Sequence, residues 1–182
     1  IRCHSLKNQN IELNLIVPKI DFLEATAKII KENLEAVGLK RINLYFLGQD
    51  ELLNDVIKTN NYEMILFGNI LENPIDLFSF WHSSQRFYPG LNLSLYQNTK
   101  VDTLIENIRQ TEDKAKQLEL LKNTEEIIIK DMPALFLFSL PYTYIHPKNL
   151  GGTDFEKNYL VTPEDRFLNV AKWSLMNARI IK

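Results

Sequence analysis

The sequence predicts an α/β domain, because strand and helix patterns alternate along the first part of the chain. Residues 11–17 alternate apolar and polar side chains, which is typical of a half-buried strand. Apolar residues then recur every three or four positions from Leu23 to Val37 and mark one face of a helix. A second apolar strand is predicted over residues 42–47. This order of strand, helix and strand favours a sheet with a helix packed against it.

Local signals define the ends of the first strand and the first helix. Pro18 is predicted to end the strand. Asp21 stands where an N-cap belongs and Glu24 follows three residues later, which predicts a capping box. Gly38 fits the left-handed residue that closes a helix. The helix is therefore predicted to run from Asp21 to just before Gly38.

The next segment predicts a short helix and a third strand. The short helix spans residues 51–58. Its inward side chains are predicted to be Leu52, Val56 and Ile57. Residues 62–70 are apolar at nearly every position after Glu63, which suits a central strand covered on both faces. Residues 71–99 contain Asn-Pro and Pro-Gly pairs without a sustained period, so loops with short helical turns are predicted there.

Two further helices, a strand and a tail complete the predicted organisation. The first of these helices is marked by Val101, Leu104, Ile105 and Ile108. The second is marked by Ala115, Leu118, Leu121 and Ile128. Pro133 ends it, and residues 134–144 are apolar and aromatic enough for a buried strand. Because Gly151-Gly152 punctuates the chain, we place a boundary near 150, between a domain of residues 1–150 and a tail of residues 151–182.

Composition excludes several classes of function. The formal net charge of -2 and the lack of a Lys/Arg-rich run argue against nucleic-acid binding. The most apolar run, Ala134 to Leu140, is far shorter than the roughly 20 residues that a bilayer requires. The single Cys3 cannot form an internal disulfide. The chain opens at Ile1 without Met or a signal peptide, so we expect a truncated or processed piece.

No motif for catalysis, metal binding or cofactor binding is predicted. The three histidines share no spacing of four residues, and the six glycines form no phosphate-binding pattern. A Gly-x-Ser-x-Gly nucleophile elbow is missing from the sequence. The adjacent pair His82-Ser83 is not evidence of a triad, because neighbouring residues seldom face each other productively. We therefore predict a chain that is not an enzyme and needs neither a metal nor a cofactor.

Several short motifs follow one another along the chain in a specific order. They are Tyr62-Glu63-Met64, Asn73-Pro74, Phe80-Trp81-His82-Ser83-Ser84, Gly90-Leu91-Asn92, Tyr96-Gln97-Asn98, Met132-Pro133, Asp165-Arg166-Phe167-Leu168-Asn169-Val170 and Trp173. Each motif is weak alone, and the order and spacing across residues 11–173 carry the argument. In this order the chain resembles the family 5 solute-binding proteins, the peptide- and nickel-type receptors of ATP-driven importers.

The resemblance implies a mixed-sheet second lobe of a periplasmic-binding-protein-like fold (type II, cluster C), present as an isolated C-terminal fragment. Residues 1–150 would form the ligand-binding lobe, and the tail would return toward a missing first lobe. The implied function is to capture a peptide-like solute between two lobes and deliver it to ABC permease subunits. The implied place is extracytoplasmic, as a lipoprotein attached to the membrane only through a missing N-terminal anchor. The alternative is a non-catalytic interaction or sensor domain that reuses this fold, and an α/β hydrolase is the third possibility.

The resemblance also implies where a ligand would lie. In peptide-binding members an extended ligand pairs with backbone groups of the strand that matches Phe67 to Ile70. Gly68 would permit close approach, although Gly68 and Asn69 could instead begin a turn. These members carry an aspartate, which pairs with the ligand's ammonium group, where this chain has Ile70, and the nearby Glu72 could substitute for it. The ligand could therefore be a capped or cyclic peptide, a sugar or a metal chelate.

Three more residues are candidates for ligand binding, each with a structural alternative. Trp81 could stack on ligand groups or pack in the core with neighbouring phenylalanines. Asn92 could hydrogen-bond a ligand backbone or cap the local turn. Tyr142 shares a predicted strand face with Tyr144, so either one could face the cleft or simply lie at a domain edge.

Overall fold

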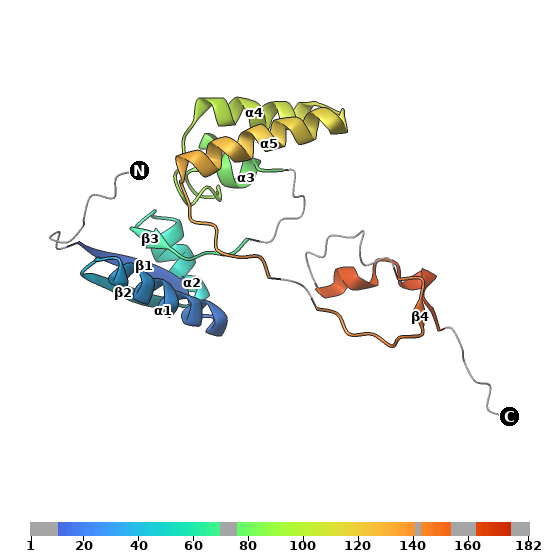
Figure 1. Cartoon of the computed structure of the whole chain (residues 1–182), viewed down its shortest axis with the longest axis horizontal. Helices are drawn as coiled ribbons and strands as arrows, with labels where there is room; N and C mark the ends of the chain where they lie inside the picture. The colour runs from blue at the N-terminus through green and yellow to red at the C-terminus, as the bar shows by residue number, and fades with distance from the viewer. Residues whose placement is uncertain (1–10, 70–75, 141–142, 154–162, 176–182) are drawn as a thin grey trace.

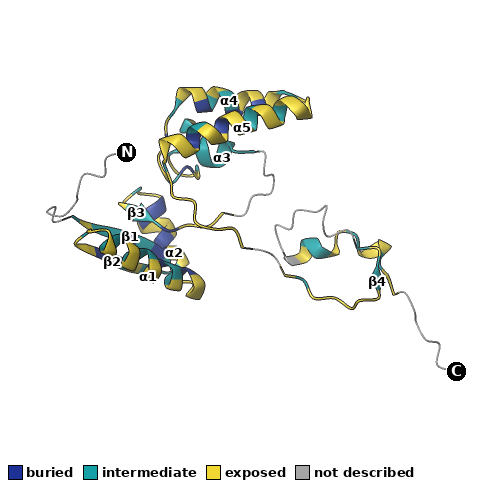
Figure 2. Ribbon diagram, in the orientation of Figure 1, coloured by how far each residue is buried: buried dark blue, intermediate teal, exposed yellow. Residues whose placement is uncertain are grey.

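The computed structural model describes residues 11–69, 76–140, 143–153 and 163–175 (Figure 1). Residues 11–69 form an α/β unit, residues 76–131 form a helical unit, and residues 143–153 with 163–175 form a small C-terminal unit. Buried residues gather in the first two units (Figure 2). The predicted α/β fold class is confirmed. The predicted boundary at 150 stays a prediction.

The sheet of the α/β unit has three parallel strands in the order β2-β1-β3. β1 (Glu12–Pro18) is central, β2 (Arg41–Leu47) pairs with it along its whole length, and β3 (Met64–Ile65) lies at the other edge. The prediction of a long central strand over residues 62–70 is wrong, because β3 pairs over only two residues. An apolar run does not reveal which edge of a strand finds a partner.

Two residues limit the pairing of β3 with β1. At its start, the Asn14 amide donates to the Glu63 carboxylate at 2.7 Å instead of to a backbone carbonyl. Leu66 still donates to the Ile16 carbonyl at 2.8 Å. The next donor in this parallel register would be the N–H of Pro18, and proline has none. The ladder therefore ends at Leu66.

The helix α1 (Asp21–Ala36) covers one face of the sheet, where Leu15, Val17, Leu23, Ala27 and Ile42 are buried together. The predicted capping box is wrong. Ile20 is the N-cap, and its carbonyl accepts from the amides of Leu23 and Glu24. Asp21 therefore lies in the first turn, one position after the N-cap, where its negative charge interacts favourably with the positive end of the helix dipole.

The prediction for the end of α1 is confirmed. Gly38 has a φ of +108°. The Gly38 amide donates to the Glu35 carbonyl and the Leu39 amide donates to the Leu34 carbonyl. This pair of bonds is the Schellman motif, and it turns the chain from the helix into β2.

The other face of the sheet is covered by a short helical segment. α2 (Gln49–Glu51) continues into a π-helix, Leu52–Ile57. The predicted inward side chains Leu52, Val56 and Ile57 are all buried, against Ile16, Leu47 and Ile65 of the strands.

The helical unit contains α3 (Phe78–Trp81), a 3-10 turn (Ser83–Gln85), α4 (Thr99–Gln110) and α5 (Lys114–Asp131). These confirm the predicted short turns and the two helices. The predicted inward face of α5 is partly wrong, because Ala115 and Leu118 are exposed. The polar Gln117 is half-buried instead, since its amide donates to the Ile108 and Thr111 carbonyls at the end of α4.

The chain beyond α5 does not form the predicted buried strand. Residues 134–140 and 143–144 have no helix or strand, and most of their apolar side chains are exposed. In the C-terminal unit, β4 (Leu150–Gly151) pairs antiparallel with β5 (Ser174–Leu175). Two 3-10 turns, Pro163–Phe167 and Val170–Lys172, precede β5.

Candidate functional site

The carboxyl ends of the three parallel strands lie at the same end of the sheet. β1 and β2 end together there, because the Lys19 amide donates to the Leu47 carbonyl at 2.9 Å. Residues Phe67–Asn69, which follow β3, are exposed at the same end of the sheet. Ligands of open parallel sheets bind outside the carboxyl ends of the strands. This end of the sheet is therefore the candidate site.

The backbone of Phe67, Gly68 and Asn69 is open to a ligand. No hydrogen bond joins it to another residue in the part of the chain that the structure describes. A Cβ built at Gly68 would meet nothing within 4 Å. An extended peptide could pair with this edge, since its backbone supplies the complementary donors and acceptors.

The structure favours packing roles for two other candidates. The Trp81 ring lies 6.3 Å from the Tyr96 ring, edge to face, and 5.7 Å from the Phe136 ring. Asn92 is 1% exposed, and its amide nitrogen donates to the carbonyls of His82 and Tyr96. Its amide oxygen accepts from the Tyr96 amide and the Ser94 hydroxyl. The four bonds use all hydrogen-bonding groups of the Asn92 side chain.

The remaining candidates, Ile70, Glu72 and Tyr142, lie outside the described residues. The ligand-binding roles of all eight residues therefore stay predictions. Of the five candidates that the structure describes, Phe67, Gly68 and Asn69 lie together at this end of the sheet.

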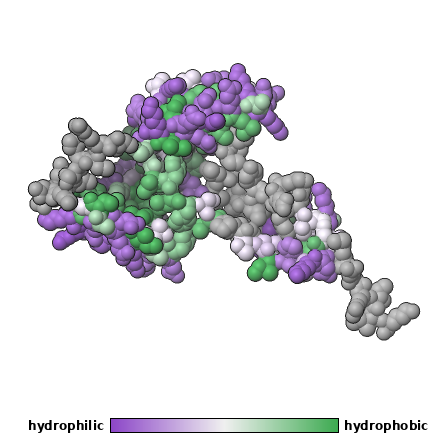
Figure 3. All heavy atoms as spheres, in the orientation of Figure 1, coloured by the Kyte–Doolittle hydropathy of each residue, from purple (hydrophilic) through white to green (hydrophobic). Residues whose placement is uncertain are grey.

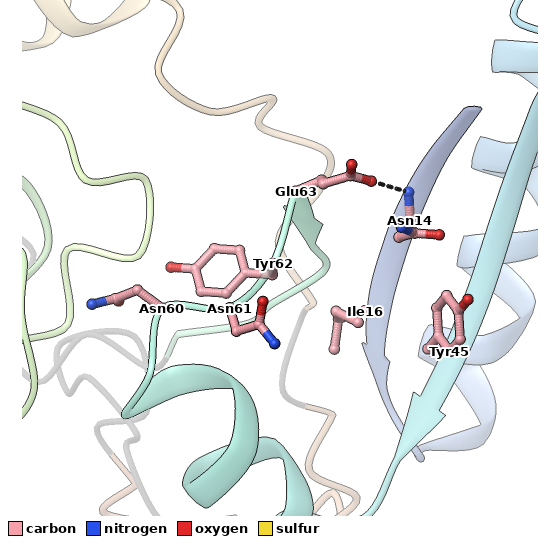
Figure 4. A pocket seen from close by; sticks show the side chains of 7 residues that line it. All are labelled: Asn14, Ile16, Tyr45, Asn60, Asn61, Tyr62 and Glu63. Carbon is pink, nitrogen blue, oxygen red and sulfur yellow. Dashed lines mark hydrogen bonds between the residues drawn. The ribbon is translucent and has the colours of Figure 1, made fainter. Parts of the chain in front are cut away.

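A polar pocket of about 430 Å³ was not predicted (Figure 4). It opens on the sheet face opposite α1, beside residues 60–63, which precede β3 in the chain. Its walls are Asn14, Ile16, Tyr45, Asn60, Asn61, Tyr62 and Glu63. The Asn14 side chain accepts from Asn43 at 3.1 Å, and the Tyr62 hydroxyl donates to the Leu93 carbonyl. The signal in the sequence was the pair of polar residues at alternate positions at the start of each strand, Glu12 and Asn14 in β1 and Arg41 and Asn43 in β2, which makes this part of the sheet face hydrophilic.

A serine, a histidine and a glutamate also form a chain of contacts in the helical unit. His82 Nδ1 lies 2.8 Å from Ser84 Oγ, and His82 Nε2 lies 3.3 Å from Glu106 Oε1. The Ser84 backbone amide also donates to Nδ1, at 3.2 Å, so His82 caps the 3-10 turn. Asp102 accepts from the Ser83 amide and hydroxyl and ties the same turn to α4. These bonds hold the 3-10 turn against α4, which accounts for the cluster without a catalytic role.

A second polar cluster fastens the end of α5 to the start of α4. The Asp131 carboxylate accepts from the Tyr96 hydroxyl at 2.6 Å and from the Asn98 amide at 2.8 Å. The two donors lower the pKa of Asp131. Burial, together with the bond to Asp131, raises the pKa of Tyr96 to about 12. The three side chains thus link the two helices, and we call this cluster the lock.

Neither a metal cluster nor a membrane span is found in the described ranges. No three His, Cys, Asp or Glu side chains of these residues converge as metal ligands would. None of the helices in these ranges has the length and apolarity needed to cross a bilayer.

Comparison with known proteins gives a result at the level of structure. No protein-family model and no curated protein sequence matches the chain. The oligopeptide-binding protein AppA from Bacillus subtilis, solved with a nonapeptide, matches with a TM-score of 0.65 at 22% identity, over 91% of this chain and 32% of that one. NikZ from Campylobacter jejuni, solved with Ni(L-His), matches with a TM-score of 0.63 at 18% identity, over 90% of this chain and 33% of that one.

A third solved structure agrees with these two. A putative peptide-binding protein AppA from Clostridium difficile matches with a TM-score of 0.67 at 18% identity, over 93% of this chain and 34% of that one. This chain spans about a third of the length of each of the three. The predicted resemblance is therefore confirmed as a likeness of fold: the chain has the α/β fold of one part of a peptide- or nickel-type solute-binding protein.

Proposed function

We propose that this chain is a ligand-binding lobe of a solute-binding protein, which captures a peptide-like solute and delivers it to an ABC permease outside the cytoplasm. The observation that carries the proposal is the open backbone edge at Phe67–Asn69. Solved proteins of the same fold were obtained with a nonapeptide, with the peptide STSA and with Ni(L-His). An open strand edge suits the first two kinds of ligand.

Backbone pairing gives affinity without selecting side chains, which suits a receptor for many sequences. A net hydrogen bond contributes about 1 kcal/mol, so an edge of three residues contributes about 3 kcal/mol before the cost of ordering the peptide. A dissociation constant of 1 mM corresponds to about 4 kcal/mol. We therefore expect this chain alone to bind a short peptide in the millimolar range or weaker, and a second lobe to supply the rest.

The proposal is tested by titrating the ¹⁵N-labelled chain with the blocked tripeptide Ac-Ala-Ala-Ala-NH₂. Amide shifts are expected at Leu66 to Asn69. The substitution Gly68→Val should abolish them, because its side chain fills the space that the peptide needs. Thr103→Val is the control, since Thr103 is an exposed residue of α4 in the helical unit and lies outside the strand ends. Shifts that gather elsewhere, or that survive Gly68→Val, would contradict the proposal.

The end groups of the peptide give a second measurement in the same titration. Because Ile70 stands where an ammonium-binding aspartate is expected, a free amino terminus gains no partner there. The blocked tripeptide should bind at least as tightly as free Ala-Ala-Ala. A tenfold preference for the free peptide would show that another carboxylate, such as Glu72, takes this role.

A non-catalytic interaction or sensor domain is the second candidate function. It is favoured by the packing of Trp81 on Tyr96 and Phe136, because these aromatic side chains are occupied by the chain itself. The absence of any peptide-induced shift would support this candidate over the first.

A further inference from the structure

The polar pocket on the sheet face opposite α1 has the size and the composition of a binding site. Its volume of about 430 Å³ lies within the range of roughly 300–1,000 Å³ that is typical of small-molecule sites. Six of its seven lining residues carry a polar side-chain group, and Ile16 is the exception. This lining differs from the hydrophobic surface that crosses the middle of the visible face of the molecule (Figure 3).

The walls of the pocket are held by bonds that leave other groups open. Glu63 accepts from the Asn14 backbone amide through Oε2 at 2.7 Å, and the Asn14 side chain accepts from Asn43 through Oδ1 at 3.1 Å. The Asn61 backbone amide donates to the Val56 carbonyl at 3.2 Å, which anchors Asn61 behind the π-helix. Within the described ranges, no hydrogen bond uses Glu63 Oε1, Asn14 Nδ2 or the Asn61 side-chain amide. Groups held in this way need little ordering when a ligand binds.

Tyr45 adds an aromatic surface to the pocket. It pairs with Ile16 in the register of β2 and β1, so both side chains lie on the pocket face. Tyr45 is 48% exposed, and its hydroxyl makes no hydrogen bond to the part of the chain that the structure describes. Figure 4 shows the Asn61 amide and the Glu63 carboxylate directed toward the two strands. The pocket thus combines an accessible aromatic ring with open polar groups.

The open groups discriminate between classes of ligand. None of the seven lining residues is Lys or Arg, so an anion would meet only the negative charge of Glu63. A cation would find one exposed carboxylate, and an exposed ion pair contributes little. Hydroxyl groups match the whole set, because each of them both donates and accepts, as the amides and the phenol also do. The C–H face of a sugar ring can in addition lie on the Tyr45 ring.

We propose that this pocket binds one ring of a neutral sugar. The Asn61 amide and the Glu63 carboxylate hydrogen-bond its hydroxyl groups, and the Tyr45 ring covers its apolar face. Because the pocket is open to solvent and its contacts are few, the expected dissociation constant is of millimolar order.

The pocket is separate from the strand ends proposed for a peptide. Pro18 ends β1 at that site, and Asn14 lies four positions earlier, which is about 13 Å along the strand. Nearer to the strand ends, the π-helix packs on Leu47 and Ile65. All of the lining residues lie between positions 14 and 63, so the pocket is formed within the α/β unit. Sugar binding therefore goes beyond the proposed function and does not depend on it.

An NMR titration of the ¹⁵N-labelled whole chain tests the inference, with D-glucose, D-galactose and D-mannose as separate probes. At least one of these sugars should shift the side-chain amides of Asn14 and Asn61. Asn61→Ala and Tyr45→Ala should each weaken its binding about fivefold or more, because each removes a direct contact. Asn33→Ala is the matched control, since Asn33 is an exposed asparagine of α1, the helix on the opposite face of the sheet. The dispersion of the spectra shows whether each variant is folded.

Three results would overturn the inference. The first is that none of the three sugars shifts the pocket amides. The second is that Asn61→Ala binds the sugar as tightly as Asn33→Ala does. The third is a larger shift of the same amides with methylammonium chloride, which would assign the pocket to cations.

The variant Gly68→Val separates this inference from the proposed peptide site. It should abolish the peptide-induced shifts and leave sugar binding unchanged. Sugar-induced shifts that disappear in Gly68→Val would show one shared site and would refute a separate pocket.

Discussion

The substitution Asn92→Ala separates the two roles considered for Asn92. A residue kept only for a ligand can be removed with little effect on stability. A residue that organises the loop cannot, and the four hydrogen bonds of Asn92 indicate the second role. We expect Asn92→Ala to destabilise the helical unit strongly.

The magnitude follows from the groups that lose a partner. Ser94 is exposed, so its hydroxyl turns to water at little cost. The Tyr96 amide and carbonyl belong to a buried residue and would be left unsatisfied, whereas the His82 carbonyl would keep the Gln85 amide as its donor. Each unsatisfied buried group costs about 1–3 kcal/mol. Allowing for water that enters the vacated space, we expect a loss of about 4 kcal/mol.

Amide hydrogen exchange measures this loss within the helical unit itself. The slowest amides of α4 should be those of the buried residues Ile105 and Ile108, and their protection should fall by about three orders of magnitude. Asn107→Ala is the control, because Asn107 is an exposed residue in α4 and alanine favours helix. A loss below about 1 kcal/mol in Asn92→Ala would refute the structural role and return Asn92 to the list of ligand-binding candidates.

Two further predictions concern the loop and the lock between helices. Gly90→Ala should lower the free energy of unfolding by about 1–3 kcal/mol in thermal unfolding, because the added Cβ would lie 2.2 Å from a backbone oxygen. Gly68→Ala is the control, because its Cβ meets open space and should leave stability nearly unchanged. Equal effects of the two substitutions would contradict this packing. In the folded protein the pKa of Tyr96 is raised to about 12, so its stabilising contribution is complete below pH 10 and is lost as the pH rises from about 10 to 12. The melting temperature should therefore fall over this range, and Tyr96→Phe should reduce the fall. The Asp131 pKa is lowered, so its contribution is lost in acid instead, below about pH 4; a Tyr96→Phe variant that keeps both drops would contradict the lock.

Periodicity predicted the elements whose packing is local. The face of α4 is confirmed because Val101, Ile105 and Ile108 recur at helical spacing and are all buried, the first two in one cluster with Tyr96 and Ile128. The end of α1 was predicted from Gly38 because only a positive φ lets the chain turn there. In both cases the residue type and the backbone geometry determine each other within a few positions.

Predictions failed where a distant partner decides the outcome. Gln117 faces inward because carbonyls at the end of α4 need a donor, and no hydrophobicity pattern contains that need. The apolar segment 134–140 reads as a buried strand, yet in this chain no strand lies beside it among the described residues.

The same limit applies to the candidate site. Gly68 was predicted from resemblance, whereas the openness of its edge depends on Pro18, fifty residues earlier in the chain. Proline at that position withholds the donor that would continue the ladder beyond Leu66. Replacing a paired strand by an open edge costs stability and leaves a place for a ligand backbone. The clearest physical argument for a binding role thus rests on a residue that no ligand needs to touch.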